Sequence, residues 1–141
     1  MPYEYLNHLA DLGIRGIGPT LECALSQGAC AMLAAMAKVD TVSTVHTYTQ
    51  HCAAPDIPSL FIEWLNELLY QREIHGALFA RARVTKVVKT KRGWTLEGQA
   101  FGEPLDPDRH EIHSEVKAAT YAGLNYRIEG GQHIVQCILD L

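Results

Sequence analysis

The hydrophobic period of this chain changes several times along its length, and that change is the strongest constraint on the fold. Apolar residues recur at the spacing of one helix face near residues 20–37 and again from Leu60 to Leu69. Thr20 precedes the first segment as a candidate N-cap, Asp56 and Ser59 around Pro58 are candidate caps of the second, and Gly76 follows the second as a candidate stop. Two helices are therefore expected.

Most of the remaining sequence favours strands, because apolar and polar residues alternate or because Thr, Val and Tyr accumulate. The Lys91-Arg92-Gly93 turn predicts an antiparallel hairpin, and the two prolines of 102–110 indicate a loop. The expected strands lie within residues 3–17, 41–52, 80–85, 94–100, 116–121, 124–128 and 133–141. The expected fold is α+β: a single layered domain over residues 1–141, with two α-helices packed on a mostly antiparallel β-sheet.

Length and charge narrow the classes of function. A chain of 141 residues can bury a real core as one domain. Its net charge is -4 with 12 Lys plus Arg, which argues against a basic stripe for strong phosphate binding, so RNA is expected to be contacted only indirectly through a partner. No apolar run reaches the roughly 20 residues of a membrane span, and the first residues do not resemble a signal peptide, so a cytoplasmic location with no membrane partner is expected.

The four cysteines show no C-x-x-C spacing and are expected to be reduced, small, apolar-like residues rather than a disulfide framework. They are Cys23, Cys30, Cys52 and Cys137.

Asp140 ends an apolar strand segment, and the α-carboxylate of Leu141 follows one residue later. If Asp11 folds beside Asp140, three anionic groups share a small volume and need a cation. Carboxylate oxygens suit Ca²⁺, with Mg²⁺ as the alternative, better than Zn²⁺. The competing interpretation is that Asp11 caps a turn and Asp140 lies in open solvent.

Other polar residues allow further interpretations. His110 and His113 could bind zinc together with Glu115 or Cys52, although the segment contains no H-E-x-x-H helix. Glu115 and Lys117 fall on one face of an expected strand, where they could pair with each other or border the acidic pocket. His8 could orient Asp11 or fill a polar niche.

Five segments resemble, in order, the signature blocks of the archease family, and together they extend over nearly the whole chain. The blocks are residues 8–15 (HLADLGIR), 64–70 (WLNELLY), 102–110 (GEPLDPDRH), 115–124 (EVKAATYAGL) and 138–141 (ILDL).

The resemblance implies an accessory protein, not itself an enzyme, that activates the GTP-dependent tRNA-splicing RNA ligase RtcB. Such a protein promotes guanylylation and multiple turnover of the ligase and can broaden its NTP use. The resemblance also implies a divalent metal, bound through the positions of Asp11, Asp140 and Leu141. A general chaperone or scaffold is the alternative function, and a metal-dependent hydrolase that uses His110 and His113 is a third.

Overall fold

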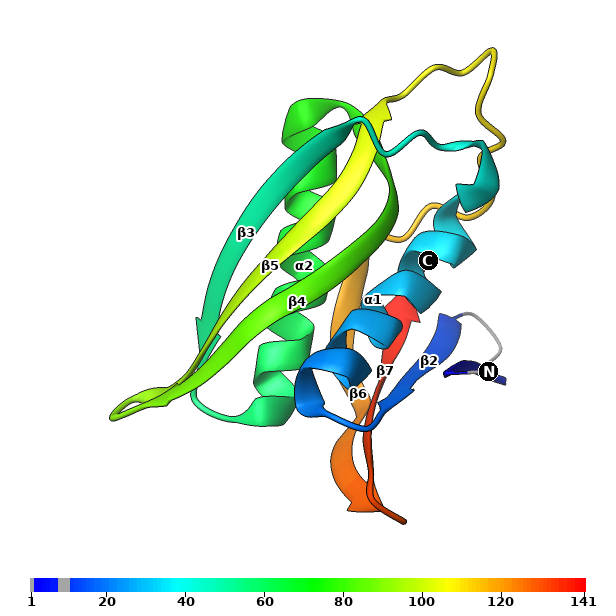
Figure 1. The fold of residues 1–141 in the computed structure, drawn as a ribbon. Helices are drawn as coiled ribbons and strands as arrows, with labels where there is room; N and C mark the ends of the chain where they lie inside the picture. Colours follow the sequence, from blue (N-terminus) through cyan, green and yellow to red (C-terminus); the bar gives the residue numbers. More distant parts are fainter. Residues whose placement is uncertain (1, 8–10) are drawn as a thin grey trace.

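The strands form two antiparallel sheets, ordered β1-β2-β7-β6 and β3-β5-β4 (Figure 1). The computed structural model describes residues 2–7 and 11–141. The first sheet contains β1 (Tyr3–Asn7), β2 (Asp11–Gly18), β6 (Ala118–Glu129) and β7 (Gln132–Asp140). The second contains β3 (His46–Ala54), β4 (Ala77–Thr90) and β5 (Gly93–Pro104).

Capping residues explain where the helices begin and where α2 ends, because they satisfy the hydrogen-bonding backbone groups at the helix ends. Helix α1 (Leu21–Met36) starts after Thr20, whose hydroxyl accepts a hydrogen bond from a first-turn N–H. Helix α2 (Ile57–His75) starts after Asp56, whose carboxylate does the same, and it ends at Gly76 with φ 56°. Glycine adopts this left-handed conformation without steric cost, which explains the stop. A single 3₁₀ turn (Val39–Thr41) follows α1.

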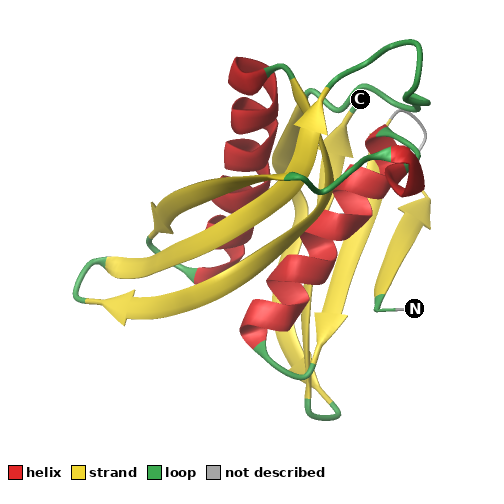
Figure 2. Cartoon of the chain, turned by 45° about the horizontal axis from the view of Figure 1, so that its top comes forward, coloured by secondary structure: helices red, strands yellow, loops and turns green. Residues whose placement is uncertain are grey.

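The helices bridge the two sheets. Helix α1 contacts β2 and β7 of one sheet and β4 of the other, whereas α2 contacts β6 and the strands β3 and β5 (Figure 2). Trp64 of α2 is fully buried, and its indole N–H donates to the Leu25 carbonyl of α1 at 3.1 Å. The approach of α1 to β2 requires a glycine at position 16, because a Cβ there would lie 2.2 Å from the Ala24 carbonyl oxygen.

The α+β class, both helices and the antiparallel pairing are as the sequence predicted. The structure differs in having two sheets rather than one and longer hairpin strands. Residues 102–104 belong to β5, so the loop begins at Leu105, and β6 begins only at Ala118. No helix in residues 2–7 and 11–141 is long and apolar enough to cross a membrane.

Candidate functional site

The acidic residues from the two ends of the sequence meet at one end of the β1-β2-β7-β6 sheet. Strands β2 and β7 pair antiparallel, and Asp11 stands directly opposite Asp140 in their register. On the other side of β7, Ala118 of β6 faces Asp140, and the Lys117 N–H donates to the Asp140 carbonyl at 2.8 Å. Because β7 is an interior strand, the backbone of Asp140 is held from both sides.

Both carboxylates lie on the sheet face that is turned away from the helices. Ile14 of β2 points toward the helices and is fully buried, and side chains alternate along a strand, so Asp11 points to the opposite face. Directly opposed residues share a face, which places the Asp140 side chain beside that of Asp11. Asp11 is half-buried and Asp140 is exposed, so the pair is accessible from solvent.

Leu141 follows Asp140, and its side chain packs against the hydrophobic core. This packing anchors the residue that follows Asp140, and a third carboxylate at Leu141 stays a prediction from the sequence. Two carboxylates are thereby gathered on one short stretch of sheet.

The arrangement fits a hard divalent cation. The Cβ atoms of directly opposed side chains in a sheet lie about 5 Å apart. At that distance two like charges repel each other by roughly 1 kcal/mol at an effective dielectric constant of about 80 and by roughly 3 kcal/mol at about 20. No ion pair to Asp11 or Asp140 is found in the described part of the chain. That part also contains no group of three or more His, Cys, Asp or Glu side chains able to hold an ion, so the metal site expected at Asp11, Asp140 and Leu141 stays a prediction. His8, the other residue expected near Asp11, lies outside the described residues.

The histidines expected at a zinc site are engaged elsewhere. The His110 side chain is fully buried, and both of its ring nitrogens have partners within the chain. His113 is exposed and lies 3.1 Å from a Glu111 carboxylate oxygen. Neither joins Glu115 or Cys52 in a metal-binding group among residues 2–7 and 11–141, so the zinc interpretation is not supported.

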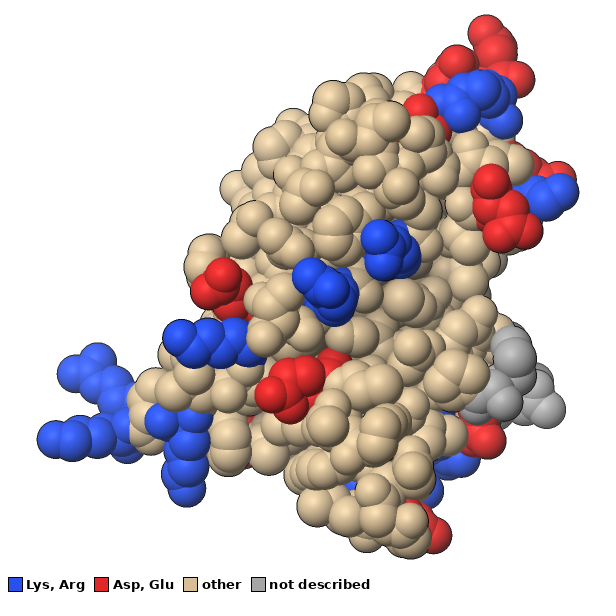
Figure 3. Space-filling model, viewed as in Figure 1, with Lys and Arg blue, Asp and Glu red and all other residues tan. Residues whose placement is uncertain are grey.

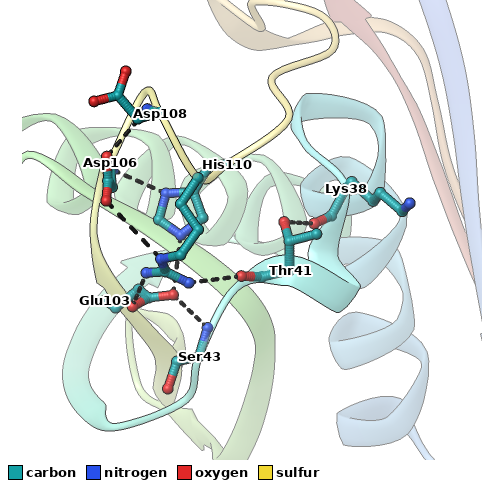
Figure 4. A network of polar contacts seen from close by, with 8 residues as sticks. Lys38, Thr41, Ser43, Glu103, Asp106, Asp108 and His110 are labelled. Carbon is teal, nitrogen blue, oxygen red and sulfur yellow. Dashed lines mark hydrogen bonds and ion pairs between the residues drawn. The ribbon is translucent and has the colours of Figure 1, made fainter.

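His110 belongs to a polar network that sequence reasoning did not find (Figure 4). The Glu103 carboxylate at the end of β5 accepts hydrogen bonds from the Arg109 guanidinium, from the Ser43 N–H at 2.6 Å and from the His110 Nε2 at 3.0 Å. The Asp106 N–H donates to His110 Nδ1 at 2.9 Å. Because Nδ1 accepts, Nε2 carries the ring proton and His110 is neutral. The network ties residues 105–110 to the segment after the 3₁₀ turn.

This network predicts a specific acid sensitivity. Hydrogen bonds from Arg109, Ser43 and His110 lower the pKa of Glu103 from its ordinary 4.5 to about 2. A lowered folded-state pKa contributes stability that is fully present above pH 4.5 and is lost as the pH falls toward 2. We expect Glu103→Gln to be less stable than the parent at pH 7, with a difference that shrinks as the pH approaches 2. Urea unfolding at several pH values would test this, and a constant difference would contradict it.

Of the two interpretations of Glu115 and Lys117, the pairing is not found: the residues precede β6, and no ion pair joins them in the described chain. Lys117 does border the acidic pair, because its N–H donates to the Asp140 carbonyl. Glu115 and Lys117 also line a cleft of about 680 Å³ against the second half of α2. The other residues of the cleft are Asn66, Leu69, Tyr70, Arg72, Glu73, Ile74 and Val116.

The cysteines are free thiols, as expected. Burial raises the pKa of Cys52 and of Cys137 to about 12 and also raises that of Cys30. A thiol that stays protonated is a poor nucleophile and a poor metal ligand, so none of these three is suited to covalent catalysis.

Comparison with known proteins identifies the family. A sequence model described as the archease protein family (MTH1598/TM1083) matches residues 3–141. The chain belongs to the archease family. The archease of Methanopyrus kandleri is 36% identical over 141 residues, which cover 100% of both chains. The archease of Pyrococcus abyssi is 35% identical over 140 residues, which cover 99% of this chain and 98% of that protein.

Solved structures of this family share the fold. The solution structure of Methanobacterium thermoautotrophicum protein 1598 matches with a TM-score of 0.85 and 28% identity, covering 99% of both chains. A crystal structure from Thermotoga maritima, described as an archease and possible chaperone, matches with a TM-score of 0.63 over 96% of this chain and 94% of that one. Its identity of 14% bears on the fold alone.

Proposed function

We propose that this archease is an accessory protein of the GTP-dependent tRNA-splicing RNA ligase RtcB. It promotes guanylylation and multiple turnover of the ligase and can broaden its NTP use. Family membership gives the class of protein, and the observation that carries the proposal is the register of Asp11 with Asp140 on an accessible sheet face.

The residues of the site have distinct roles in this proposal. Asp11 and Asp140 present two carboxylates from adjacent strands, and the Lys117 N–H fixes the strand that carries Asp140. Leu141 supplies a third carboxylate while its side chain remains in the core. A bound Ca²⁺ or Mg²⁺ would supply positive charge at this surface. The surface is exposed to solvent, so the ligase or its bound nucleotide could reach that charge. These residues bind and orient; they carry no bond-breaking step of their own.

An accessory role fits the chemistry available within the described residues. The buried histidine is held neutral by the Asp106 N–H and the Glu103 carboxylate, and the buried thiols of Cys52 and Cys137 stay protonated. None of these groups is placed as a nucleophile beside a base, so the chain itself offers little for hydrolysis or ligation. The reaction then belongs to the partner enzyme.

A general chaperone is the second candidate. The observation in its favour is a set of exposed apolar side chains around the C-terminal half of α2 and the segment after β5: Tyr70, Ile74, Leu105 and Ile112. The Thermotoga maritima relative is also described as a possible chaperone. A chaperone should rescue unrelated aggregating proteins and should be indifferent to changes at Asp11 and Asp140.

A ligation time course with limiting ligase tests the proposal. With RNA substrate and GTP in excess, the ligase alone should stop near one product per enzyme, and addition of the archease should give many products per enzyme. Repeating the reaction with ATP tests the broader nucleotide use. Equal product curves with and without the archease would contradict the proposal, and rescue of heat-treated citrate synthase to the same degree as the ligase would favour the chaperone.

A further inference from the structure

The charge of this acidic chain is distributed very unevenly. The hairpin β4–β5, residues 77–104, contains six of the 12 Lys and Arg but only two of the 16 Asp and Glu. The hairpin therefore carries +4, and the remainder of the chain carries -8. The net charge of -4 is the sum of these two regions, so it hides a basic region that the sequence analysis argued against.

Three of the six cations form a row on the open face of the β3-β5-β4 sheet. Arg81, Arg83 and Lys86 are exposed and stand opposite Phe101, Gln99 and Glu97 of β5. The Arg81 guanidinium lies 4.5 Å from the centre of the Phe101 ring. Among the residues that the structure describes, Glu97 is the one acid left on this face, because Glu103 is engaged by Arg109 and His110. Figure 3 shows Lys and Arg side chains along this hairpin.

The other three cations surround the hairpin tip. Lys89, Lys91 and Arg92 are all exposed, and the Lys89 ammonium lies 5.8 Å from the centre of the half-buried Trp94 ring. In Figure 1 the tip extends away from the body of the molecule, well separated from the C-terminus. The Lys and Arg side chains at that end form the largest blue group in Figure 3.

Protection of a sheet edge explains only part of this pattern. Strand β4 is an edge strand, and exposed Lys or Arg on an edge discourage pairing with another chain. That role accounts for charges along the strand, but it does not require cations in the turn at Lys91 and Arg92. It also does not require cations set against two partly exposed aromatic rings, those of Phe101 and Trp94.

We propose that the row of cations on the open face and the tip of the β4–β5 hairpin together bind single-stranded RNA through its phosphates. From Arg81 to Lys86 the strand spans about 16 Å at roughly 3.3 Å per residue, and the tip at Lys91 and Arg92 continues beyond it, so these cations follow a line, as the charges of an extended polyanion do. On the open face Phe101 offers its ring to a base, and Gln99 and neighbouring threonines offer hydrogen bonds to phosphate oxygens. A compact acidic patch on a protein partner would be matched better by a cluster of cations than by cations in a line, so the arrangement favours RNA over an acidic protein. The choice of RNA rests on the proposed function, in which the ligase holds the same RNA.

Fluorescence anisotropy with a labelled 12-nucleotide single-stranded RNA tests this inference in the isolated protein. Each phosphate contact lowers the slope of log affinity against log salt by about 0.7 for a single strand. Lys91→Gln with Arg92→Gln should therefore make the slope shallower by about 1.4 and weaken binding at 50 mM salt on the order of tenfold. Both positions are exposed in a turn, so far-UV circular dichroism should remain unchanged.

The matched control is Lys38→Gln with Arg127→Gln, which removes one exposed Lys and one partly exposed Arg outside the hairpin. It should leave the salt slope unchanged. No measurable RNA binding, equal loss in both double variants, or equal affinity for a polyglutamate peptide of the same charge would each overturn the inference. Because this measurement contains no ligase, its failure is distinguishable from a failure of ligase stimulation, which is read from the turnover experiment.

Discussion

Asp140→Asn should lower the multiple-turnover stimulation of the ligase by roughly 10- to 100-fold, the range typical of damage to a metal site. Asparagine has nearly the same shape as aspartate, so β7 should keep its pairing with β2 and β6. The change removes one negative charge from the group formed with Asp11 and Leu141. Asp11→Asn should act in the same way. The measurement is product per ligase over time at a fixed excess of RNA and GTP.

The matched control is Asp40→Asn, which removes one carboxylate from an exposed position in the 3₁₀ turn. It should stimulate the ligase like the parent. Calorimetric titration with Ca²⁺ and with Mg²⁺ separates metal binding from docking, because both site variants should bind an ion more weakly while the control should not. If Asp140→Asn stimulated as well as the parent, the acidic pair would have no role in the activity.

Trp64→Ala should reduce the free energy of unfolding by about 3–5 kcal/mol, the usual cost of removing a buried tryptophan side chain. Trp64 is fully buried on α2, donates a hydrogen bond to the Leu25 carbonyl of α1 and lies against Gly98 of β5. Its loss opens a cavity between two helices and a sheet at once. Urea unfolding followed by far-UV circular dichroism measures the change, and a loss below 1 kcal/mol would contradict this packing.

Gly98→Ala provides a complementary test from the opposite side of the same contact. A Cβ at position 98 would lie 2.6 Å from the Trp64 ring, so the substitution should overpack the site and cost about 1–3 kcal/mol. Combined with Trp64→Ala, the added methyl group should cost less or even stabilise, because it enters the cavity left by the indole. The two changes should therefore be non-additive, which a double-mutant cycle detects.

The sequence predicts the helices well because their signals are local. Thr20, Asp56 and Gly76 mark helix ends through contacts with residues only a few positions away, and the apolar stripes lie within single segments. The hairpin turn at 91–93 is equally local. Each of these features depends only on interactions between residues that are close together in the sequence.

The division into two sheets could not be predicted in the same way. Pairing of β2 with β7 and of β3 with β5 joins segments far apart in the sequence, and alternation alone does not specify the partner of a strand. The Glu103 network was missed for the same reason, since Ser43 and Arg109 reach it from separate loops. Residues 115–117 alternate like a strand but precede β6, because alternation without a pairing partner does not make a strand.

The candidate site was predictable in composition but not in geometry. An acid near each end of the chain suggested that Asp11 and Asp140 could meet, and the β2–β7 register places them directly opposite each other. Net charge, in contrast, concealed the basic hairpin, because a sum over the chain carries no information about where cations gather. Six cations within residues 81–92 were the signal that a local count would have found.

The central place of β7 between β2 and β6 also sets the order of folding events. Until β7 arrives, β2 has only β1 beside it, and the carboxylates of Asp11 and Asp140 have no common location. Long-range pairing of this kind closes a large loop and is slow compared with helix formation. An ion that needs both aspartates should therefore slow unfolding while leaving the early refolding steps unaffected, so that it prolongs the lifetime of the native state rather than guiding the chain toward it.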